Sequence, residues 1–129
     1  GAIILLMPKK AFVVDDNRST AESLAKMLTM MDIEVTICLG PREAIQRLSG
    51  GVPDFMTLDV NMPGVSGLEV VKYIRRDPRI ADMPVIIISS DAQTAEMAKA
   101  LLAGANVFLP KPVDYERLEL AVKDVLGGN

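Results

Sequence analysis

The sequence predicts one α/β domain in which a parallel β-sheet lies between two layers of helices. Short apolar runs rich in β-branched residues alternate with helical patterns along the 129 residues. These runs are mostly continuous rather than alternating with polar residues, which is typical of strands covered on both faces. Strands that alternate with helices favour right-handed crossovers, and hence parallel strands in a three-layer sandwich.

The predicted strands share a short apolar centre and end beside a polar or turn-forming residue. They span residues 11–15, 33–38, 55–59, 85–89 and 107–109. The helical patterns between them span residues 19–31, 41–48, 66–76, 91–103 and 114–126. Ser19 and Glu22 have the spacing of a capping box. Pro41 suits the first turn of its helix, and Gly104 suits a C-terminal cap.

Composition narrows the chemistry that this chain supports. Its net charge of −3 and sequence pI of about 4.9 argue against direct binding to a nucleic-acid backbone. With no histidine and one cysteine, Cys38, the chain has no His-based catalysis, internal disulfide or Cys-based zinc site. Any metal must be held by oxygen, which favours Mg²⁺, Mn²⁺ or Ca²⁺. The single cysteine also favours a reducing, cytoplasmic compartment.

The first residues differ from the rest of the chain. The apolar run 2–7 is shorter than the roughly 20 residues that span a bilayer, and it lacks the basic start of a signal peptide. Met7, followed by Pro8 and two lysines, looks like a natural start. We therefore interpret residues 1–8 as a remnant or linker and residues 9–127 as the domain. The alternative for residues 1–6 is an exposed piece that docks on a partner.

Polar side chains occur where the predicted strands end. Asp15 and Asp16 close the first strand and Asp59 closes the third. Ser89 closes the fourth strand, and Lys111 follows the fifth. The second strand ends without a charge, which is consistent with an outer position. Because carboxyl ends of parallel strands share one edge, where such folds bind ligands, these residues are expected to converge.

Converging carboxylates repel one another unless their charge is compensated. A divalent cation such as Mg²⁺ does this with few protein oxygens, because it usually keeps several waters. Lys111 adds a mobile positive charge, and Ser89 adds a hydroxyl donor. A metal, a lysine and a hydroxyl around one carboxylate suit the oxygens of a phosphoryl group. Asp59, on the central strand, is then the predicted nucleophile.

Four motifs, VVDDN, LDVNMPG followed by SG, PVIIISS and LPKP, occur in this order. Over residues 9–126 they resemble the receiver domain of bacterial two-component response regulators. The separations of 30 residues from Asp59 to Ser89 and 22 residues from Ser89 to Lys111 are similar to those of the family. The resemblance implies a flavodoxin-like fold with five helices and a five-stranded parallel sheet of order 2-1-3-4-5.

The resemblance also implies roles for the matching residues. Asp59 resembles the phosphoacceptor. Asp15 and Asp16 resemble the acidic pair that holds Mg²⁺ or Mn²⁺, with Asp16 bound mainly directly and Asp15 partly through water. Asn61 lies where the family places a backbone carbonyl on the metal. Lys111 resembles the phosphate-binding lysine.

Ser89 and Phe108 occupy the two switch positions of the family. Serine keeps the hydroxyl of the commoner threonine. Phe108 lacks the hydroxyl of tyrosine, so only its burial can report the signal. The bond between Lys111 and Pro112 is expected to be cis, as in relatives.

The leading hypothesis is a phosphorylation switch. A sensor histidine kinase or phosphotransfer protein would donate a phosphoryl group to Asp59 with Mg²⁺ bound. The 91–126 face would then repack and change its binding to a downstream target or a linked output domain. The domain would catalyse only its own phosphorylation and dephosphorylation, without contacting membrane or nucleic acid. The resemblance leaves a phosphorylation-dependent homodimer open.

Two other functions fit part of the sequence. A Mg²⁺-dependent phosphatase that passes through an aspartyl phosphate is suggested by the Asp-Val-Asn run. However, Asn61 replaces the second aspartate of the Asp-x-Asp hydrolases, which is their general acid, and no cap domain is recognised. A binding module would use the fold without phosphorylation.

Overall fold

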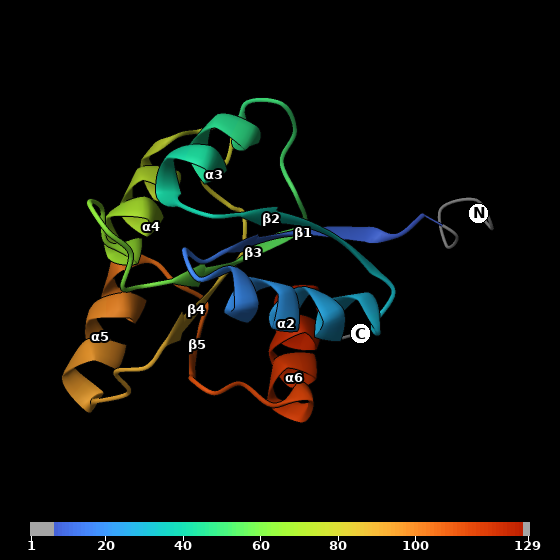
Figure 1. Cartoon of the computed structure of the whole chain (residues 1–129). Helices are drawn as coiled ribbons and strands as arrows, with labels where there is room; N and C mark the ends of the chain where they lie inside the picture. Colours follow the sequence, from blue (N-terminus) through green and yellow to red (C-terminus); the bar gives the residue numbers. More distant parts are fainter. Residues whose placement is uncertain (1–6, 128–129) are drawn as a thin grey trace.

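A computed structural model describes residues 7–127 (Figure 1). The strands of its sheet are β1 (Lys9–Val14), β2 (Ile33–Cys38), β3 (Phe55–Asp59), β4 (Val85–Ser89) and β5 (Val107–Pro110). All neighbouring strands are parallel, and their order is β2-β1-β3-β4-β5. The predicted flavodoxin-like sheet is confirmed, with β2 at one edge as expected.

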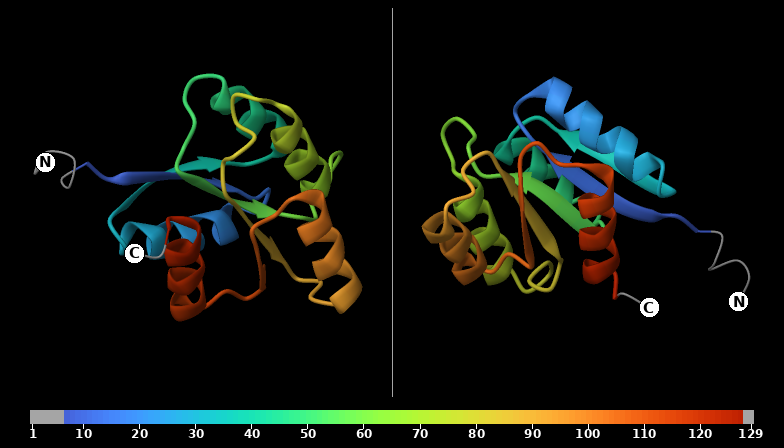
Figure 2. Two further views of the ribbon diagram at one scale, coloured as in Figure 1. Left: turned by 180° about the vertical axis from the view of Figure 1, so that it is seen from behind. Right: turned by 90° about the horizontal axis from the view of Figure 1, so that it is seen from below.

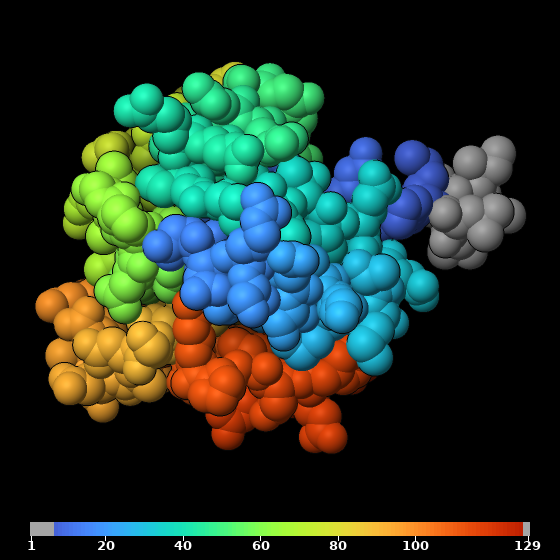
Figure 3. Space-filling model, in the orientation of Figure 1, coloured from blue at the N-terminus to red at the C-terminus, as the bar shows by residue number. Residues whose placement is uncertain are grey.

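Helices cover both faces of this sheet. Residues 7–127 contain five of them: α2 (Arg18–Thr29), α3 (Pro41–Leu48), α4 (Gly67–Arg76), α5 (Thr94–Ala103) and α6 (Tyr115–Val125). Helices α3, α4 and α5 lie on one face, and α2 and α6 lie on the other (Figures 1 and 2). Figure 3 shows α2 packed beside α6 on the second face. The predicted three-layer sandwich is therefore correct.

Two apolar cores result from this layering, because successive strand residues point to opposite faces. Met56 and Leu58 pack toward α3, α4 and α5, whereas Phe55 packs toward α2 and α6. Every residue of β3 and β4 is buried. The central strands thus provide a rigid base for whatever side chains stand at their carboxyl ends.

Two predicted helix starts were wrong. The N-cap of α2 is Asn17, whose side chain accepts a hydrogen bond from the Thr20 N–H at 3.0 Å, so the predicted capping box at Ser19 does not form. Helix α5 begins at Thr94 rather than at residue 91, because its N-cap, Gln93, has an extended backbone. The other predicted boundaries agree within two residues, the usual uncertainty of helix and strand ends.

The predicted remnant or linker is only partly covered by the structure, since residues 1–6 lie outside the described residues. Within residues 7–127, no helix has the length and apolar character that crossing a membrane requires.

Candidate functional site

The carboxyl edge of the sheet carries the polar residues that the sequence predicted there. Asp15 and Asp16 follow β1 directly, and Asp59 is the last residue of β3. Ser89 is the last residue of β4, and Lys111 follows β5. Three of them, Asp15, Asp59 and Ser89, are buried despite being polar.

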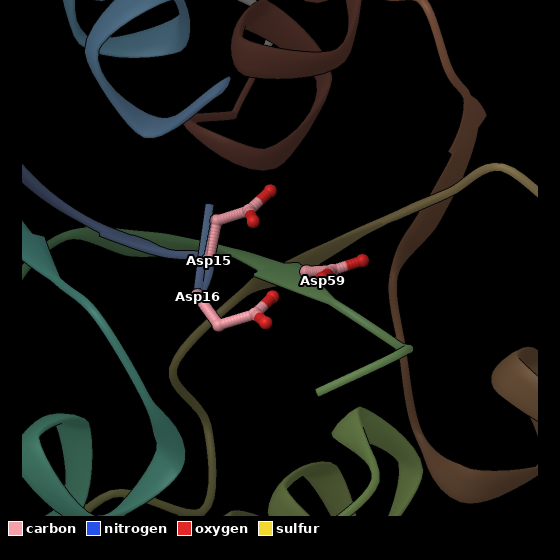
Figure 4. A group of neighbouring side chains, drawn as sticks. All are labelled: Asp15, Asp16 and Asp59. Atoms are coloured by element: carbon pink, nitrogen blue, oxygen red, sulfur yellow. The ribbon is translucent and has the colours of Figure 1, made fainter. Parts of the chain in front are cut away.

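Three carboxylates form the centre of this site. Asp15, Asp16 and Asp59 each contribute an oxygen, and these oxygens all lie within 4.8 Å of one another. Figure 4 shows the three side chains projecting from the ends of β1 and β3 into one region. Asp15 and Asp59 are 1% and 4% exposed, whereas Asp16 is exposed. The site is therefore an acidic cluster with one side open to solvent.

Lys111 is the cation of the cluster. Its Nζ lies 3.1 Å from Oδ2 of Asp15 and 3.2 Å from Oδ1 of Asp59, and its side chain is 23% exposed. The Lys111 N–H also donates to the Ser89 carbonyl at 2.8 Å, which extends the β4–β5 pairing beyond the strand end. The Lys111–Pro112 bond is cis, as the sequence predicted.

The two carboxylates that Lys111 bridges are also held by backbone N–H groups. Oδ1 of Asp15 accepts from the Asn17 N–H at 2.9 Å. Oδ1 of Asp59 accepts from the Asn61 N–H at 3.4 Å. In contrast, Oδ2 of Asp59 accepts no hydrogen bond from any described residue. One oxygen of Asp59 is thus fixed, while the other has no hydrogen-bond donor within residues 7–127.

Burial and charge shift the pKa values of the two central groups. Burial, and then repulsion from Asp15, raise the pKa of Asp59, and Lys111 offsets only part of this effect. Burial lowers the pKa of Lys111, but hydrogen bonding to Asp15 and the charge of Asp59 outweigh it, so this pKa is raised. Lys111 therefore stays protonated, and the ionised cluster remains under-compensated.

The turn after β3 brings α4 against Asp59. The Gly67 N–H donates to the Val60 carbonyl at 2.8 Å, and Ser66 caps α4 by accepting from the Leu68 N–H at 3.1 Å. A Cβ on residue 67 would lie 2.4 Å from the Asp59 carbonyl oxygen. Only glycine fits there, and its close packing fixes the backbone of Asp59.

Ser89 and Phe108 border a small cavity beside the site. The cavity has a volume of about 20 Å³ and is also lined by Val60 and Leu68. Ser89 Oγ accepts a hydrogen bond from the Asp91 N–H at 3.1 Å, so it is engaged with the loop that leads to α5. Phe108 is half-buried against the core beneath α4 and α5.

The structure thus brings Asp15, Asp16, Asp59 and Lys111 together as predicted, and it places Ser89 on the adjacent strand. The sequence did not single out the Thr57 hydroxyl, the one fully buried side-chain polar atom in residues 7–127 that lacks a hydrogen-bond partner. Its only signal in the sequence was a polar residue between the apolar residues Met56 and Leu58 of a buried strand.

The sequence from residue 11 to residue 123 matches the family of response regulator receiver domains. The chain belongs to this family. Receiver domains serve two-component signalling and are not conventional enzymes. The motifs VVDDN and LPKP, in which the acidic pair and the lysine stand, both fall within the matched residues.

Curated relatives of this receiver domain are named response regulators. Response regulator MprA of Mycolicibacterium vanbaalenii is 34% identical over 120 residues, which cover 93% of the chain and 51% of the relative. Response regulator MprA of Mycobacterium tuberculosis is 32% identical with the same coverage. The chain spans about half the length of the curated relatives that it matches.

Solved structures resemble the receiver domain over nearly its whole length. A response regulator from Chloroflexus aurantiacus has a TM-score of 0.90 and 29% identity, covering 94% of this chain and 99% of the other. Chemotaxis protein CheY4 of Vibrio cholerae has a TM-score of 0.87 and 27% identity, covering 93% and 100%. A receiver domain from a histidine kinase of Syntrophus aciditrophicus has a TM-score of 0.85 and 28% identity, covering 93% and 91%.

Proposed function

We propose that this receiver domain accepts a phosphoryl group on Asp59 and uses the added charge as a signalling switch. The observation that carries the proposal is the bridge of Lys111 between Asp15 and Asp59, at 3.1 and 3.2 Å. A lysine held against a buried carboxylate is positioned to meet the oxygens of a group bound to that carboxylate.

Mg²⁺ or Mn²⁺ fits the carboxylate side of the site. Asp15, Asp16 and Asp59 bring their oxygens within 4.8 Å of one another, and Lys111 offsets only one of their three charges. We assign these three carboxylates and the backbone carbonyl of Asn61 as the groups that would hold the ion. A bound ion would supply positive charge to the oxygens of Asp59 and of the phosphoryl group.

Asp59 would act as the nucleophile through Oδ2, the oxygen without a hydrogen bond from the described residues. Attack forms an O–P bond to Asp59 and breaks the N–P bond of the donor phosphohistidine, whose electron pair stays on the imidazole nitrogen. Lys111 would shift from the Asp59 carboxylate to a phosphoryl oxygen. Later attack by water on phosphorus would restore the carboxylate, so the domain would catalyse only its own modification and its reversal.

Ser89 and Phe108 would convert the new charge into a change of shape. To donate to a phosphoryl oxygen, the Ser89 side chain would rotate toward Asp59 and so move its Oγ away from the Asp91 N–H, which it accepts from in the present structure. The cavity of about 20 Å³ beside it is only the size of a water molecule, so Phe108 would move inward as Ser89 and the loop after it vacate space. Repacking of the 91–126 face would follow. About 5.5 kcal/mol moves a two-state equilibrium from 1:99 to 99:1, so a few charge-assisted bonds suffice.

The proposed partners follow from the family and the relatives. A sensor histidine kinase or phosphotransfer protein would supply the phosphoryl group, as expected for a receiver domain of two-component signalling. The named relatives are about twice as long as this chain, which supports a linked output domain or a separate target as the reader of the 91–126 face. We place this exchange in the cytoplasm.

Intact-mass measurement after incubation with acetyl phosphate and Mg²⁺ tests the proposal. The expected result is the gain of one phosphoryl group per chain, absent without Mg²⁺ and absent in Asp59→Asn. Continuous release of phosphate over many turnovers would instead indicate a phosphatase. A chain that gains no mass and releases no phosphate would be a binding module, and the proposal would be wrong.

Thermal melts test the metal assignment separately. Ligand that binds only the native state adds RT ln(1 + [L]/Kd), which is about 1.4 kcal/mol at ten times Kd. Mg²⁺ should therefore raise the Tm of the wild type but not that of Asp16→Ala. Asp54→Ala is a matched control, because Asp54 is an exposed aspartate that lies outside the acidic cluster. A full Mg²⁺ shift in Asp16→Ala would refute the assignment.

A further inference from the structure

Helix α5 is the helix with the least burial in residues 7–127. Ala100 is its only buried residue, whereas α4, which also has ten residues, buries four. In its first turn, Thr94, Ala95 and Met97 are exposed. Segments with few buried apolar contacts have low local stability. The hydrogen bonds that hold α5 in place therefore lie mainly at its two ends.

The carboxyl end of α5 is held by Arg75 of α4. Arg75 Nε donates to the Gly104 carbonyl at 2.9 Å, and its Nη2 donates to Asn106 Oδ1 at 2.9 Å. Its Nη1 donates to the carbonyls of Ala81 and Met83 at 3.0 and 2.7 Å. All four acceptors are uncharged, and hydrogen bonds from a charged donor are the stronger kind. One guanidinium thus joins α4, the 81–83 loop, the end of α5 and the start of β5.

Asn106 extends this attachment to the sheet. Its Oδ1 also accepts from the Val85 N–H at 2.8 Å, and its own N–H donates to the Val85 carbonyl at 2.9 Å. Val85 is the first residue of β4, an interior strand that is entirely buried. Gly104, in a left-handed conformation with φ 116°, ends α5 against the Arg75 side chain. The carboxyl end of α5 is therefore bonded to the rigid part of the domain.

The amino end of α5 is held by fewer hydrogen bonds than its carboxyl end. Its N-cap, Gln93, makes no side-chain capping bond. Instead, the Gln93 N–H donates to Oδ1 of Asp91 at 3.2 Å, and the Asp91 N–H donates to Oγ of Ser89 at 3.1 Å. The Gln93 carbonyl accepts from the N–H groups of Glu96 and Met97 in the first turn. A single chain of hydrogen bonds thus leads from Ser89 to α5, through the side chain of Asp91.

We propose that Arg75 anchors a lever: α5 pivots on its carboxyl end at Gly104, and Asp91 latches its amino end to Ser89. This inference rests on the proposed phosphorylation of Asp59. When Ser89 turns toward the phosphoryl group, the Asp91 N–H loses its acceptor and the first turn of α5 is released. The carboxyl end stays in place, because none of the Arg75 bonds involves a residue that moves. Within α5, the signal is therefore motion of residues 91–98, not displacement of the whole helix.

Hydrogen exchange of the full chain, with and without Mg²⁺ and beryllofluoride, an aspartyl-phosphate mimic, tests the lever. In the wild type, beryllofluoride should lower protection of residues 96–98, where hydrogen-bonded N–H groups of α5 begin, by about tenfold or more and leave residues 100–106 unchanged. Asp91→Ala should show that loss without beryllofluoride, and Asp91→Asn, which keeps an Oδ1 acceptor, should resemble the wild type. An equal beryllofluoride effect over residues 96–106 would overturn the proposal.

The anchor is tested with Arg75→Lys, which keeps the charge but cannot reach all four acceptors. Protection of residues 100–106 should fall about tenfold with or without beryllofluoride, whereas Arg76→Lys, on the exposed neighbour, should change nothing. Asn106→Ala removes one acceptor and replaces Arg75→Lys if that variant does not fold. Unchanged protection in the folded variant would overturn the anchor. These comparisons need no beryllofluoride, so a wild type that does not respond to it would refute the phosphorylation proposal and leave the anchor test valid.

Discussion

The contact between Gly67 and Asp59 gives the sharpest test of how the β3–α4 turn holds the phosphoacceptor. A Cβ at residue 67 would lie 2.4 Å from the Asp59 carbonyl oxygen and 2.9 Å from Val60 Cα. Real Cβ atoms essentially never come closer than 3.0 Å to another heavy atom, so a shift of at least 0.6 Å is required. Both neighbours are backbone atoms, and no change of rotamer can relieve the overlap.

We expect Gly67→Ala to lower the free energy of unfolding by about 1–3 kcal/mol, the usual cost of overpacking. In a domain of this size, each kcal/mol lowers Tm by about 3–5 °C. The displaced Asp59 should also accept a phosphoryl group from acetyl phosphate about tenfold more slowly, because misplacement by less than 1 Å already disturbs a reacting geometry. Thermal melts and the rate of mass gain measure the two effects.

Gly40→Ala is the matched control. Gly40 precedes α3 with an extended φ of 178°, and an added Cβ would have no neighbour within 4 Å. Because Gly40 is the N-cap of α3, the free energy of unfolding should fall by no more than about 1 kcal/mol, with no change in the rate of phosphorylation. If Gly67→Ala behaves like Gly40→Ala in both assays, α4 does not pack against Asp59 as described.

Three further substitutions test the charges and the core of the site. Burial and repulsion from Asp15 raise the pKa of Asp59, so between the ordinary pKa of an aspartate and this raised pKa the folded protein keeps a proton that the unfolded chain releases. The wild type therefore loses stability as the pH rises from the lower to the higher of these two pKa values. Without metal at pH 7, Asp59→Asn should be about 1 kcal/mol more stable than the wild type and melt a few degrees higher. This difference in Tm should disappear toward pH 4, and a difference that does not change with pH would contradict the reasoning. Thr57→Val should raise the free energy of unfolding in urea by about 1 kcal/mol, because Thr57 Oγ1 lacks a partner among the described residues; a loss would indicate an unseen hydrogen bond. Lys111→Ala should lower the free energy of unfolding in chelator by about 2 kcal/mol, seen as a lower Tm, and Mg²⁺ should restore most of this loss. In Lys111→Ala, the changes in amide chemical shift caused by beryllofluoride should stay near Asp59. If the changes in this variant extend to residues 91–126 as they do in the wild type, Lys111 is not the coupling group.

The strands and most of the acidic site were predictable because their signals are local. Continuous β-branched runs are typical of strands buried on both faces, and parallel strands bring Asp15, Asp59 and Lys111 to one edge. The site therefore follows from which residues end the strands. The sheet order needed the family resemblance, since the residues themselves favoured only an outer position for the second strand.

The features that escaped prediction depend on tertiary contacts. Ser19 and Asn17 are both good capping residues, and only the path of the chain after Asp16 decides for Asn17. Helix α5 starts late because Gln93, its N-cap, has an extended backbone and its N–H donates to the side chain of Asp91. Arg75 looks like an ordinary residue in the last turn of a helix, and its four acceptors lie 6 to 31 positions away in sequence.

Residue-level trapping of the modification tests the central claim most directly. Borohydride reduces an aspartyl phosphate to homoserine, so treatment after phosphorylation with Mg²⁺ marks the residue that carried the phosphoryl group. Peptide mass analysis should then find homoserine at position 59 alone, with none in Asp59→Asn. Homoserine at position 15 or 16, or none at any position despite the mass gain, would contradict the account.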